Sequence, residues 1–524
     1  MERDAALARL GGRFDILIIG GGATGLGAAL DAAARGYATA LIEAEDFAKA
    51  TSSRSTKLVH GGVRYLQAGE IGLVREALTE RNRLTANAPH LVRDLPFILP
   101  IYRGVDIPYY WFGLKLYDRL AGRSTLASSH LCSPQEAVGC VPGLQRDGLR
   151  AAMRYHDGQF DDARLAVTLA RTAVDKGAVI VNYTRAMRLL YENRRMCGVI
   201  ARDQETGSEL EIRATVTINA CGIFADDVRA LDGQRPPLLT HSRGSHIVVP
   251  RDALGTTEHA IIIPKTSDGR VVFATPWHEH IIIGTTDIPT SQVELDPRPT
   301  REEVDYLLTT VNPYLAQRLA LEDIQAAFAG LRPLIHRRTT TTAKQSREHL
   351  IEVSSSGLVT ITGGKWTTYR KMAEDVIDVA ARQAGLARAA SPTATLTLHA
   401  ASSARAMSDP LRTYGSDADA LLALCDERPE LRGLLHPRLP CVAAQVVYAA
   451  RHEMARTVDD VLARRTRALF LERGAALECA PAVAALLAAE LHRDVAWEHN
   501  QLSAFRTIGE STVPACQGLL QRQR

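Results

Sequence analysis

The sequence lacks several features that would place it in a simple class. Its eight cysteines are scattered without a Cys-x-x-Cys pair, which argues against a zinc ribbon, an iron–sulfur cluster and a disulfide scaffold. Its 62 Lys and Arg residues nearly balance 59 Asp and Glu residues, and the formal charge of +3 is too small to gather nucleic acid at long range. We therefore expect a reducing compartment, no metal site and no nucleic acid partner.

Long hydrophobic runs are missing too. The alanine- and leucine-rich stretch from Ala480 to Ala489 contains Pro481 and is far shorter than the roughly 20 apolar residues that span a bilayer. Residues 1–13 mix charges among alanines and leucines and do not read as an export signal. Any membrane contact is expected at the surface. A candidate is the aromatic segment Tyr109–Tyr117, for which burial inside a domain is the alternative.

What is present is a chain of ordinary globular composition. Its 524 residues, 46% hydrophobic and 23% charged, are enough for about three cores, which excludes a single small module and wholesale disorder. Residues 15–43 have the pattern strand, glycine-rich turn, helix, strand, a βαβ unit that opens a doubly wound sheet. Strand candidates at 178–182, 216–220 and 358–362 lie far apart, so a second domain is expected between segments of this sheet.

The second domain is expected to be mostly antiparallel, because short β-branched runs separated by turns fill residues 244–287. After an Ala-Ser-Pro-rich linker the pattern becomes helical, for example from Val442 to Phe470. The predicted class is thus α/β with a helical C-terminal domain. The predicted ranges are 13–100, 155–240 and 345–385 for the Rossmann-like domain, 101–154 and 241–344 for the substrate domain, 386–406 for the linker and 407–524 for the helical domain.

The glycine-rich turn has the spacing Gly20-x-Gly22-x-x-Gly25, and Glu43 ends the next strand. Glycines here permit a tight turn and let backbone N–H groups approach a pyrophosphate, which the helix N-terminus stabilises. Glu43 can bind the hydroxyls of an adenosine ribose, which disfavours a 2′-phosphorylated cofactor. The unit predicts a dinucleotide and leaves NAD and FAD both open.

Further motifs follow one another along the chain in a recognisable order. They are Thr51–Leu66, Asp161–Leu165, Asn219–Gly222, Gly244–Pro250, Pro276–Trp277, Gly284–Asp287, Leu331–Leu334, Gly363–Lys371, Arg412–Gly415 and Arg464–Thr466. With the glycine-rich unit, they resemble the FAD-dependent glycerol-3-phosphate dehydrogenases, relatives of the D-amino-acid-oxidase-like flavoproteins, over nearly the whole chain. The resemblance implies a Rossmann-like FAD-binding domain and a C-terminal helical cap.

The resemblance also implies which residues hold FAD. Besides Gly20, Gly22, Gly25 and Glu43, they are Thr51, Ser52, Ser53, Lys57, His60, Gly61, Gly62, Gly222, Gly364, Lys365, Trp366 and Thr367. Lys365 follows a strand and two glycines and opens a helix. This position would aim its cation and the helix N-terminus at the flavin edge where negative charge develops on reduction.

The implied substrate is sn-glycerol 3-phosphate, oxidised to dihydroxyacetone phosphate. Guanidinium groups suit its phosphate because their N–H forks make bidentate charged hydrogen bonds. The implied substrate residues are Arg64, Tyr65, Arg332, Arg347 and Thr285. A histidine is the natural acceptor of the hydroxyl proton, and family position favours His246 over His60. Arg332 and Lys365 complete the predicted catalytic group.

The resemblance further implies a membrane quinone as electron acceptor, a homodimer, and peripheral attachment to the inner face of the cell membrane. An oxidase that uses O₂, or an inactive flavin-binding regulatory protein, are the alternatives, and an NAD-dependent dehydrogenase is less favoured. Some residues depart from the family pattern. Thr24, Cys221 and Trp366 are expected to change packing only, whereas the basic run Ile335–Thr339 could change the pocket entrance or the subunit contact.

Overall fold

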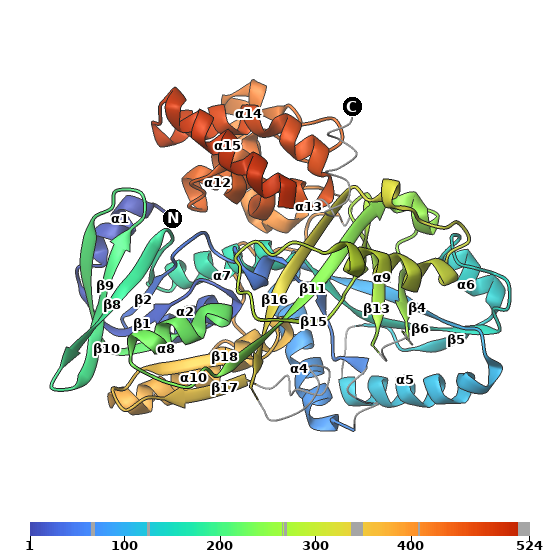
Figure 1. Ribbon diagram of the computed structural model, residues 1–524, viewed down its shortest axis with the longest axis horizontal. Helices are drawn as coiled ribbons and strands as arrows, with labels where there is room; N and C mark the ends of the chain where they lie inside the picture. Colours follow the sequence, from blue (N-terminus) through green and yellow to red (C-terminus); the bar gives the residue numbers. More distant parts are fainter. Residues whose placement is uncertain are drawn as a thin grey trace.

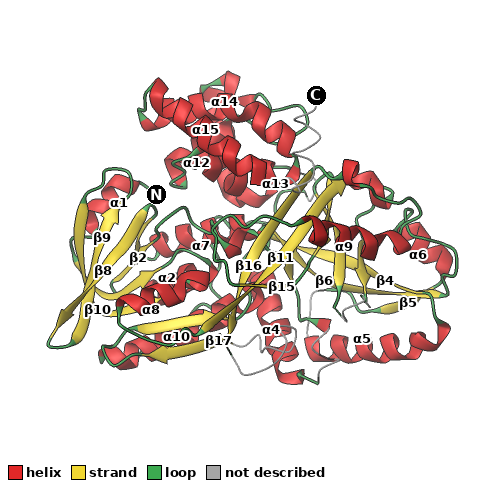
Figure 2. Ribbon diagram, viewed as in Figure 1, coloured by secondary structure: helices red, strands yellow, loops and turns green. Residues whose placement is uncertain are grey.

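A computed structural model of the chain describes residues 1–63, 66, 69–122, 126–264, 266, 270–336, 349–406 and 409–511. Two sheets lie side by side, and a group of C-terminal helices, red and orange at the top of Figure 1, lies over them (Figure 1, Figure 2). This arrangement confirms the predicted α/β class with a helical C-terminal domain.

The first sheet is assembled from distant segments. Its parallel strands, in spatial order, are β18 (Val359–Gly363), β10 (Glu209–Asn219), β1 (Arg13–Ile19), β2 (Thr39–Ile42) and β7 (Val179–Val181), with β17 (His349–Val353) antiparallel at one edge. Alternate residues of β1 face opposite sides. Ile16 and Ile18 pack against α2 (Ala23–Ala34), α7 (Asp162–Asp175) and α10 (Tyr369–Ala384). Leu17 and Ile19 pack toward α1 (Arg3–Arg9), β8 (Thr184–Glu192) and β9 (Arg195–Asp203).

The second sheet is antiparallel except where β12 pairs with β4. Its order is β15 (Ile288–Thr290), β11 (Leu239–Pro250), β14 (His280–Gly284), β13 (Val272–Trp277), β12 (Ala260–Ile263), β4 (Val92–Ile101), β6 (Ala151–Phe160) and β3 (Leu58–Val59), with β16 (Ala326–Ile335) beside β11 and β5 (His130–Cys132) beside β6. Its helices are α5 (Ile107–Ala121), α6 (Pro134–Cys140) and α9 (Arg301–Val311), whereas α4 (Ile71–Asn87) contacts α5 and also supplies Leu84 to the core of the first domain. The domain boundaries predicted at residues 100 and 154 fall inside β4 and β6, since both strands belong to this sheet.

The C-terminal domain is built from α11 (Ala418–Glu427), α12 (Ala444–His452), α13 (Ala468–Leu471), α14 (Arg473–Leu491) and α15 (Val495–Ser511). The helical pattern predicted over 442–470 is interrupted, because a π-helical turn at Asp460–Arg465 separates α12 from α13. Within the described residues, α14 alone is long and apolar enough to cross a membrane. It packs against α12, α13 and α15 and supplies Val483, Ala484 and Leu487 to the domain core, so we assign it as a core helix.

The predicted linker, residues 386–406, contains no helix or strand but is fastened to the first domain. Leu398 is buried in the same core as α2 and α7. Its N–H donates to the carbonyl of Asn87 over 3.0 Å, and Thr393 donates to Asp31 over 3.2 Å. The linker therefore fixes the chain to the first domain before the C-terminal helices begin.

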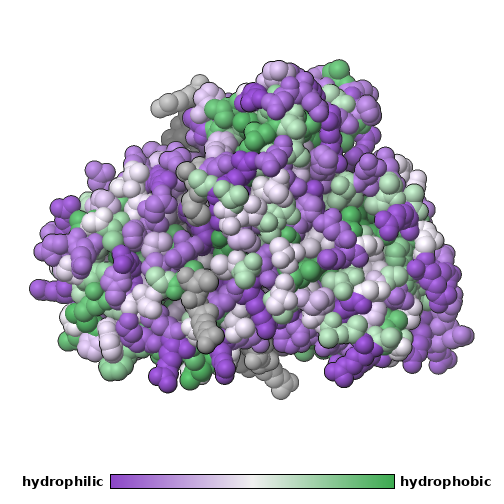
Figure 3. Space-filling model, turned by 180° about the vertical axis from the view of Figure 1, so that it is seen from behind, coloured by the Kyte–Doolittle hydropathy of each residue, from purple (hydrophilic) through white to green (hydrophobic). Residues whose placement is uncertain are grey.

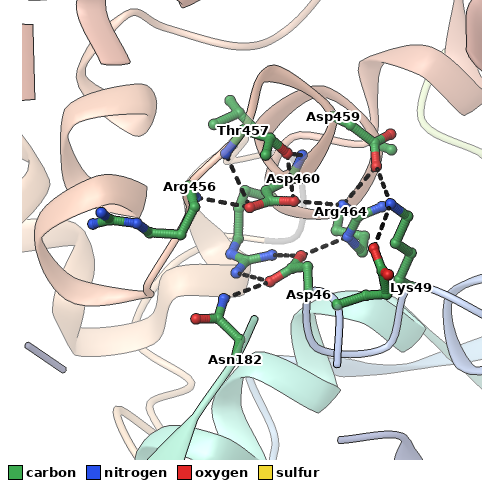
Figure 4. Close-up of polar contacts among 12 residues, drawn as sticks. Asp46, Lys49, Asn182, Arg456, Thr457, Asp459, Asp460 and Arg464 are labelled. Atoms are coloured by element: carbon green, nitrogen blue, oxygen red, sulfur yellow. Dashed lines mark hydrogen bonds and ion pairs between the residues drawn. The ribbon is translucent and has the colours of Figure 1, made fainter. Parts of the chain in front are cut away.

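Buried ion pairs attach the C-terminal domain to the first domain (Figure 4). Asp46, just after β2, accepts hydrogen bonds from Arg464 over 2.5 Å and from Arg465 over 2.7 and 2.9 Å. Arg464 also donates to Asp459 and Asp460. Burial opposes ionisation of Asp46, but Arg465 and Arg464 hold its pKa below the usual range. We call these five residues the Asp46 network.

Candidate active site

Three neighbouring cavities share lining residues, and we call them together the groove. The nucleotide end, about 440 Å³, lies at the carboxyl ends of β1, β2 and β10 and reaches Thr51. The reaction centre, about 230 Å³, also reaches Thr51 and lies between β11, β16 and the start of α10. The apolar chamber, about 910 Å³, lies against α5 and shares Thr56, Leu58, His60 and Arg332 with the reaction centre.

The glycines of the nucleotide end are required by close backbone contacts. Gly20 has a φ of 111°, and a Cβ there would lie 2.7 Å from the carbonyl oxygen of Ala220. A Cβ on Gly25 would lie 1.8 Å from the carbonyl oxygen of Gly20. α2 begins just after Gly22, which has no side chain to cap it, so N–H groups of its first turn lack partners within the helix. This geometry fits a pyrophosphate.

Two predicted side chains complete this end. Ser52 accepts a hydrogen bond from the N–H of Ala23 over 3.0 Å, at the first residue of α2. Glu43 accepts from the N–H groups of Gly21 and Glu45 over 2.5 and 2.8 Å, and burial raises the pKa of this carboxyl. Each carboxylate oxygen can accept a further hydrogen bond, so the arrangement leaves room for ribose hydroxyls. Thr24, Cys221 and Gly222 also line this cavity.

The reaction centre gathers most of the predicted catalytic and flavin-side residues. Its walls contain Thr51, His60, His246, Arg332, Gly364, Lys365, Trp366 and Thr367. Lys365 precedes a short 3₁₀ turn at Trp366–Thr368 that runs directly into α10, as expected from the sequence. Trp366 donates to the carbonyl of Ser52 over 2.8 Å, which ties the start of α10 to the nucleotide end.

His246 is held in place by its neighbours on adjacent strands. Its ring stacks on Phe328 of β16 with a centroid distance of 4.8 Å, and a Cβ on Gly284 of β14 would lie 2.2 Å from it. Its Nε2 lies 2.9 Å from the hydroxyl of Thr56. Burial lowers the pKa of His246 well below the ordinary value, and the charges of Lys57 and Arg332 lower it further. The ring is therefore neutral at neutral pH, as a proton acceptor must be.

Arg332 presents its guanidinium to the reaction centre from β16. It donates to Thr285 over 3.0 Å and to Asp287 over 3.3 Å. A Cβ on Gly244 would lie 2.3 Å from this guanidinium, so the glycine makes the room that Arg332 occupies. Thr285 and Arg332 also line the apolar chamber. The predicted pair thus lies together, where an anionic substrate would meet a fixed cation.

Three predicted cofactor residues lie behind the groove rather than on its walls. Lys57 is fully buried, and its Nζ donates to Asp162 over 2.7 Å and to the carbonyl of Ser53 over 2.9 Å. Burial lowers the pKa of Lys57 to about 7. Ser53 is buried beside it, and the N–H of Gly61 donates to the hydroxyl of Tyr117 behind the groove wall over 2.8 Å. These residues support the groove without lining it, whereas Gly62 lines the apolar chamber.

Some predicted residues lie outside the described part of the chain. They are Arg64, Tyr65, Arg347 and residues 337–339 of the basic run. The sequence analysis also missed Thr56, which lines the reaction centre and bonds His246. Thr56 belongs to the hydroxyl-rich segment Thr51–Leu66, but nothing in the sequence pairs it with a histidine 190 residues later. Within the described ranges, no cluster of three His, Cys, Asp or Glu side chains could hold a metal ion.

Comparisons with known proteins agree with this geometry. Residues 15–370 match the model of the FAD dependent oxidoreductase family, and residues 358–498 match the C-terminal domain of alpha-glycerophosphate oxidase. The chain is 40% identical to glycerol-3-phosphate dehydrogenase 2 of Mycobacterium bovis, covering 94% of this chain and 89% of the relative. It is also 40% identical to a probable mitochondrial glycerol-3-phosphate dehydrogenase of Caenorhabditis elegans, covering 95% of this chain and 73% of the relative.

Two solved structures are similar as well. A glycerol-3-phosphate dehydrogenase from Bacillus halodurans, complexed with FAD, superimposes with a TM-score of 0.79 at 30% identity over 97% of both chains. An L-alpha-glycerophosphate oxidase from Mycoplasma pneumoniae, with FAD bound, gives a TM-score of 0.57 at 17% identity over 73% of this chain and 97% of the other. The second likeness shows a shared fold only.

Proposed function

The chain belongs to the family of FAD-dependent glycerol-3-phosphate dehydrogenases, and on this basis we propose that it oxidises sn-glycerol 3-phosphate to dihydroxyacetone phosphate and passes two electrons to a membrane quinone. The observation that carries the proposal is the meeting of Arg332, His246 and Lys365 in one cavity that joins the nucleotide end through Thr51. A phosphate anchor, a proton acceptor and a cation for the flavin side are thereby brought together.

The residues of the reaction centre have distinct tasks in this reaction. FAD supplies the hydride acceptor when it is bound. Arg332 holds the phosphate of the substrate, and each charged hydrogen bond is worth about 1.5 to 3 kcal/mol. His246, kept neutral by burial, takes the proton of the alcohol, with His60 as the alternative. Lys365 lies at the cavity wall, where its cation would stabilise negative charge formed on reduction.

The apolar chamber supports a quinone as the acceptor. Its walls include Phe97, Leu99, Leu114, Ile262 and Phe273. The chamber reaches His60 and Arg332 at the reaction centre, so a lipid-soluble molecule could approach the flavin without crossing water.

The outer face of α5 supports contact with a membrane at the inner face of the cell membrane. Tyr109, Trp111, Phe112 and Leu116 are all more than one-third exposed, while Tyr110 and Leu114 on the opposite face are buried. On the face seen in Figure 3, polar and apolar residues are largely interspersed. Aromatic side chains on one helix face suit the headgroup region. The homodimer is proposed from family resemblance, and light scattering of the purified protein tests it.

Liposome co-sedimentation tests the membrane contact. Exchanging Trp111 and Phe112 for Ser should release the folded protein from vesicles. The same exchange for Ser at Val495, which is 64% exposed on α15, should leave vesicle binding unchanged. Equal binding of both variants and the parent protein would remove α5 from the account.

Anaerobic stopped-flow absorbance tests the reaction and its rivals. We expect sn-glycerol 3-phosphate to bleach the flavin band near 450 nm, and a quinone analogue to restore it rapidly. Rapid reoxidation by O₂ instead would favour an oxidase. This alternative has specific support, because the C-terminal domain matches that of alpha-glycerophosphate oxidase. A flavin that no candidate substrate bleaches would favour an inactive regulatory protein.

A further inference from the structure

The proposed base of the reaction lines the reaction centre but is almost fully buried. His246 is only 2% exposed, enclosed by Phe328 on one side and by the backbone of Gly284 on the other. Its Nε2 points at the hydroxyl of Thr56, 2.9 Å away. Among the described residues its Nδ1 has no hydrogen-bond partner. Among the described side chains, Thr56 is therefore the only one that hydrogen-bonds to this ring.

Thr56 lies where a substrate would be held. It lines both the reaction centre and the apolar chamber, together with His60 and Arg332. Unlike the imidazole behind it, Thr56 is only half-buried. For a phosphorylated alcohol anchored by Arg332, the hydroxyl of Thr56 is thus more accessible than the ring of His246.

The backbone around Thr56 is held by a single carboxylate. Ser55 donates to Asp162 through its N–H over 2.9 Å and through its hydroxyl over 2.7 Å. Lys57 donates to the same carboxylate over 2.7 Å. Lys57 has a φ of 63°, a left-handed conformation that a non-glycine residue adopts only when its surroundings impose it. The residues on both sides of Thr56 are therefore anchored behind the groove, and Thr56 is presented to it.

We propose that the Thr56 hydroxyl is a proton relay, which receives the proton of the substrate's C2 hydroxyl and gives its own proton to Nε2 of His246. The proposal rests on the function proposed above. In this step the O–H bond of the substrate breaks and a new O–H bond forms on Thr56, while the original Thr56 O–H bond breaks and an N–H bond forms on His246. The hydrogen on C2 leaves with its electron pair as hydride to FAD. When the ketone has left, the proton returns through Thr56 to water in the cavity.

The charges around His246 suit a transient rather than a permanent proton. Lys57 lies behind Phe328, with its Nζ 5.2 Å from the centre of that ring, and Arg332 is on the cavity side. Positive charge on either side chain opposes a further positive charge on the ring. It keeps the ring unprotonated before the substrate reacts and favours the return of the proton once the product is gone.

Two substitutions at Thr56 test the relay. In Thr56→Val the hydroxyl is lost at nearly constant shape, and kcat/KM for sn-glycerol 3-phosphate should fall by about 100-fold, the lower range for loss of acid–base catalysis. KM should change little, because Arg332 is intact. Thr56→Ser keeps the hydroxyl and should recover most of the rate. Thr217→Val is a matched control. Thr217 is a buried threonine of β10 whose hydroxyl has no partner among the described residues, and this variant should behave as the parent protein.

The dependence on solvent separates a relay from a packing effect. The parent protein and Thr56→Ser should give a curved proton inventory in mixtures of H₂O and D₂O, because two protons move together. In Thr56→Val the curvature should disappear, and the residual rate should rise with pH as hydroxide takes the proton. Flavin content and thermal stability measured on the same preparations check that each variant is folded.

Each outcome has a definite meaning. If the parent protein turns over and Thr56→Val keeps its rate and proton inventory, the relay is refuted and the proposed function stands. If Thr56→Val and Thr56→Ser lose rate equally, the side chain acts by packing and the relay is again refuted. If sn-glycerol 3-phosphate does not reduce the flavin of the parent protein, the proposed function fails first and the relay fails with it.

Discussion

At the nucleotide end of the groove, the groups that would bind a ligand belong mostly to the backbone of one βαβ unit. At the reaction centre, they are side chains that come from strands far apart in the sequence. The βαβ unit contains Gly20, Gly25 and Glu43. The two glycines allow close backbone contacts, and Glu43 accepts hydrogen bonds from backbone N–H groups. His246 and Arg332 act through side chains placed by β11 and β16. A phosphate is bound wherever N–H groups converge, but a proton transfer needs a particular atom at a particular place.

The C-terminal domain supports the two ends by different forces. Below the nucleotide end it uses the buried charges of the Asp46 network. Behind the reaction centre it packs Phe470 of α13 against Phe328, with ring centroids 5.1 Å apart. The ring of Phe328 in turn stacks on the ring of His246. The ionic support fixes the position of the loop after β2, and the apolar support fixes the plane of a ring.

The largest expected effect is at the nucleotide end. Gly25→Ala places a methyl group 1.8 Å from the carbonyl oxygen of Gly20, a contact that the turn cannot absorb. We expect a protein that purifies without FAD, measured as the ratio of absorbance at 450 and 280 nm. Gly72→Ala, in α4 with no atom near the added methyl, is the control and should keep its flavin. A normal flavin content in Gly25→Ala would show that the close backbone contact does not govern binding.

The next effect tests the ionic support. Asp46→Ala leaves Arg464 and Arg465 buried without their shared carboxylate, and loss of one partner of a buried pair costs about 3 to 5 kcal/mol. We expect a lower urea midpoint and faster proteolytic release of the C-terminal domain. Asp426→Ala removes an ion pair with Arg432 in which both side chains are largely exposed, and it should change neither readout appreciably. Equal stability of the two variants would contradict the assigned role of the network.

A smaller effect is expected at the reaction centre, where a side chain rather than the backbone is tested. Arg332→Lys keeps the charge but loses the planar fork, so kcat/KM should fall by about 10- to 150-fold, equivalent to roughly 1.5 to 3 kcal/mol. Most of the change should be in KM, and FAD content should be normal. Arg301→Lys, in an exposed ion pair with Asp305, should be silent. A loss of flavin in Arg332→Lys would mean that the reaction centre also determines how tightly FAD is bound.

The smallest effect concerns the pH dependence of stability. Burial lowers the pKa of His280, on β14 of the second sheet, to about 4. Between pH 6.5 and about 4 the unfolded chain therefore binds a proton that the folded chain excludes, and stability falls as the pH falls, by at most about 1.4 kcal/mol per pH unit for this residue. Thermal unfolding at pH 7 and pH 5 should show a smaller drop in His280→Gln than in the parent protein. An identical drop would exclude His280 as a contributor.

The same contrast explains what the sequence could predict. The nucleotide end was predictable because Gly20, Gly25 and Glu43 lie within one short unit whose spacing reflects its geometry. The direction of Lys57 was not predictable, because a left-handed backbone at that residue turns its side chain behind the groove. The contact of Thr56 with His246 depends on the loop before β3 meeting β11 in three dimensions. Boundaries near residues 100 and 154 were misplaced because β4 and β6 continue through them.

The Asp46 network also has a consequence for how the protein is made. Asp46 is bonded to arginines that lie 418 and 419 residues later, and Ser53 is bonded to Arg467, 414 residues later. A ribosome adds roughly 5 to 20 residues each second, so Asp46 and Ser53 are synthesised tens of seconds before these arginines. The loop after β2 can therefore gain its ionic support only long after it has left the ribosome.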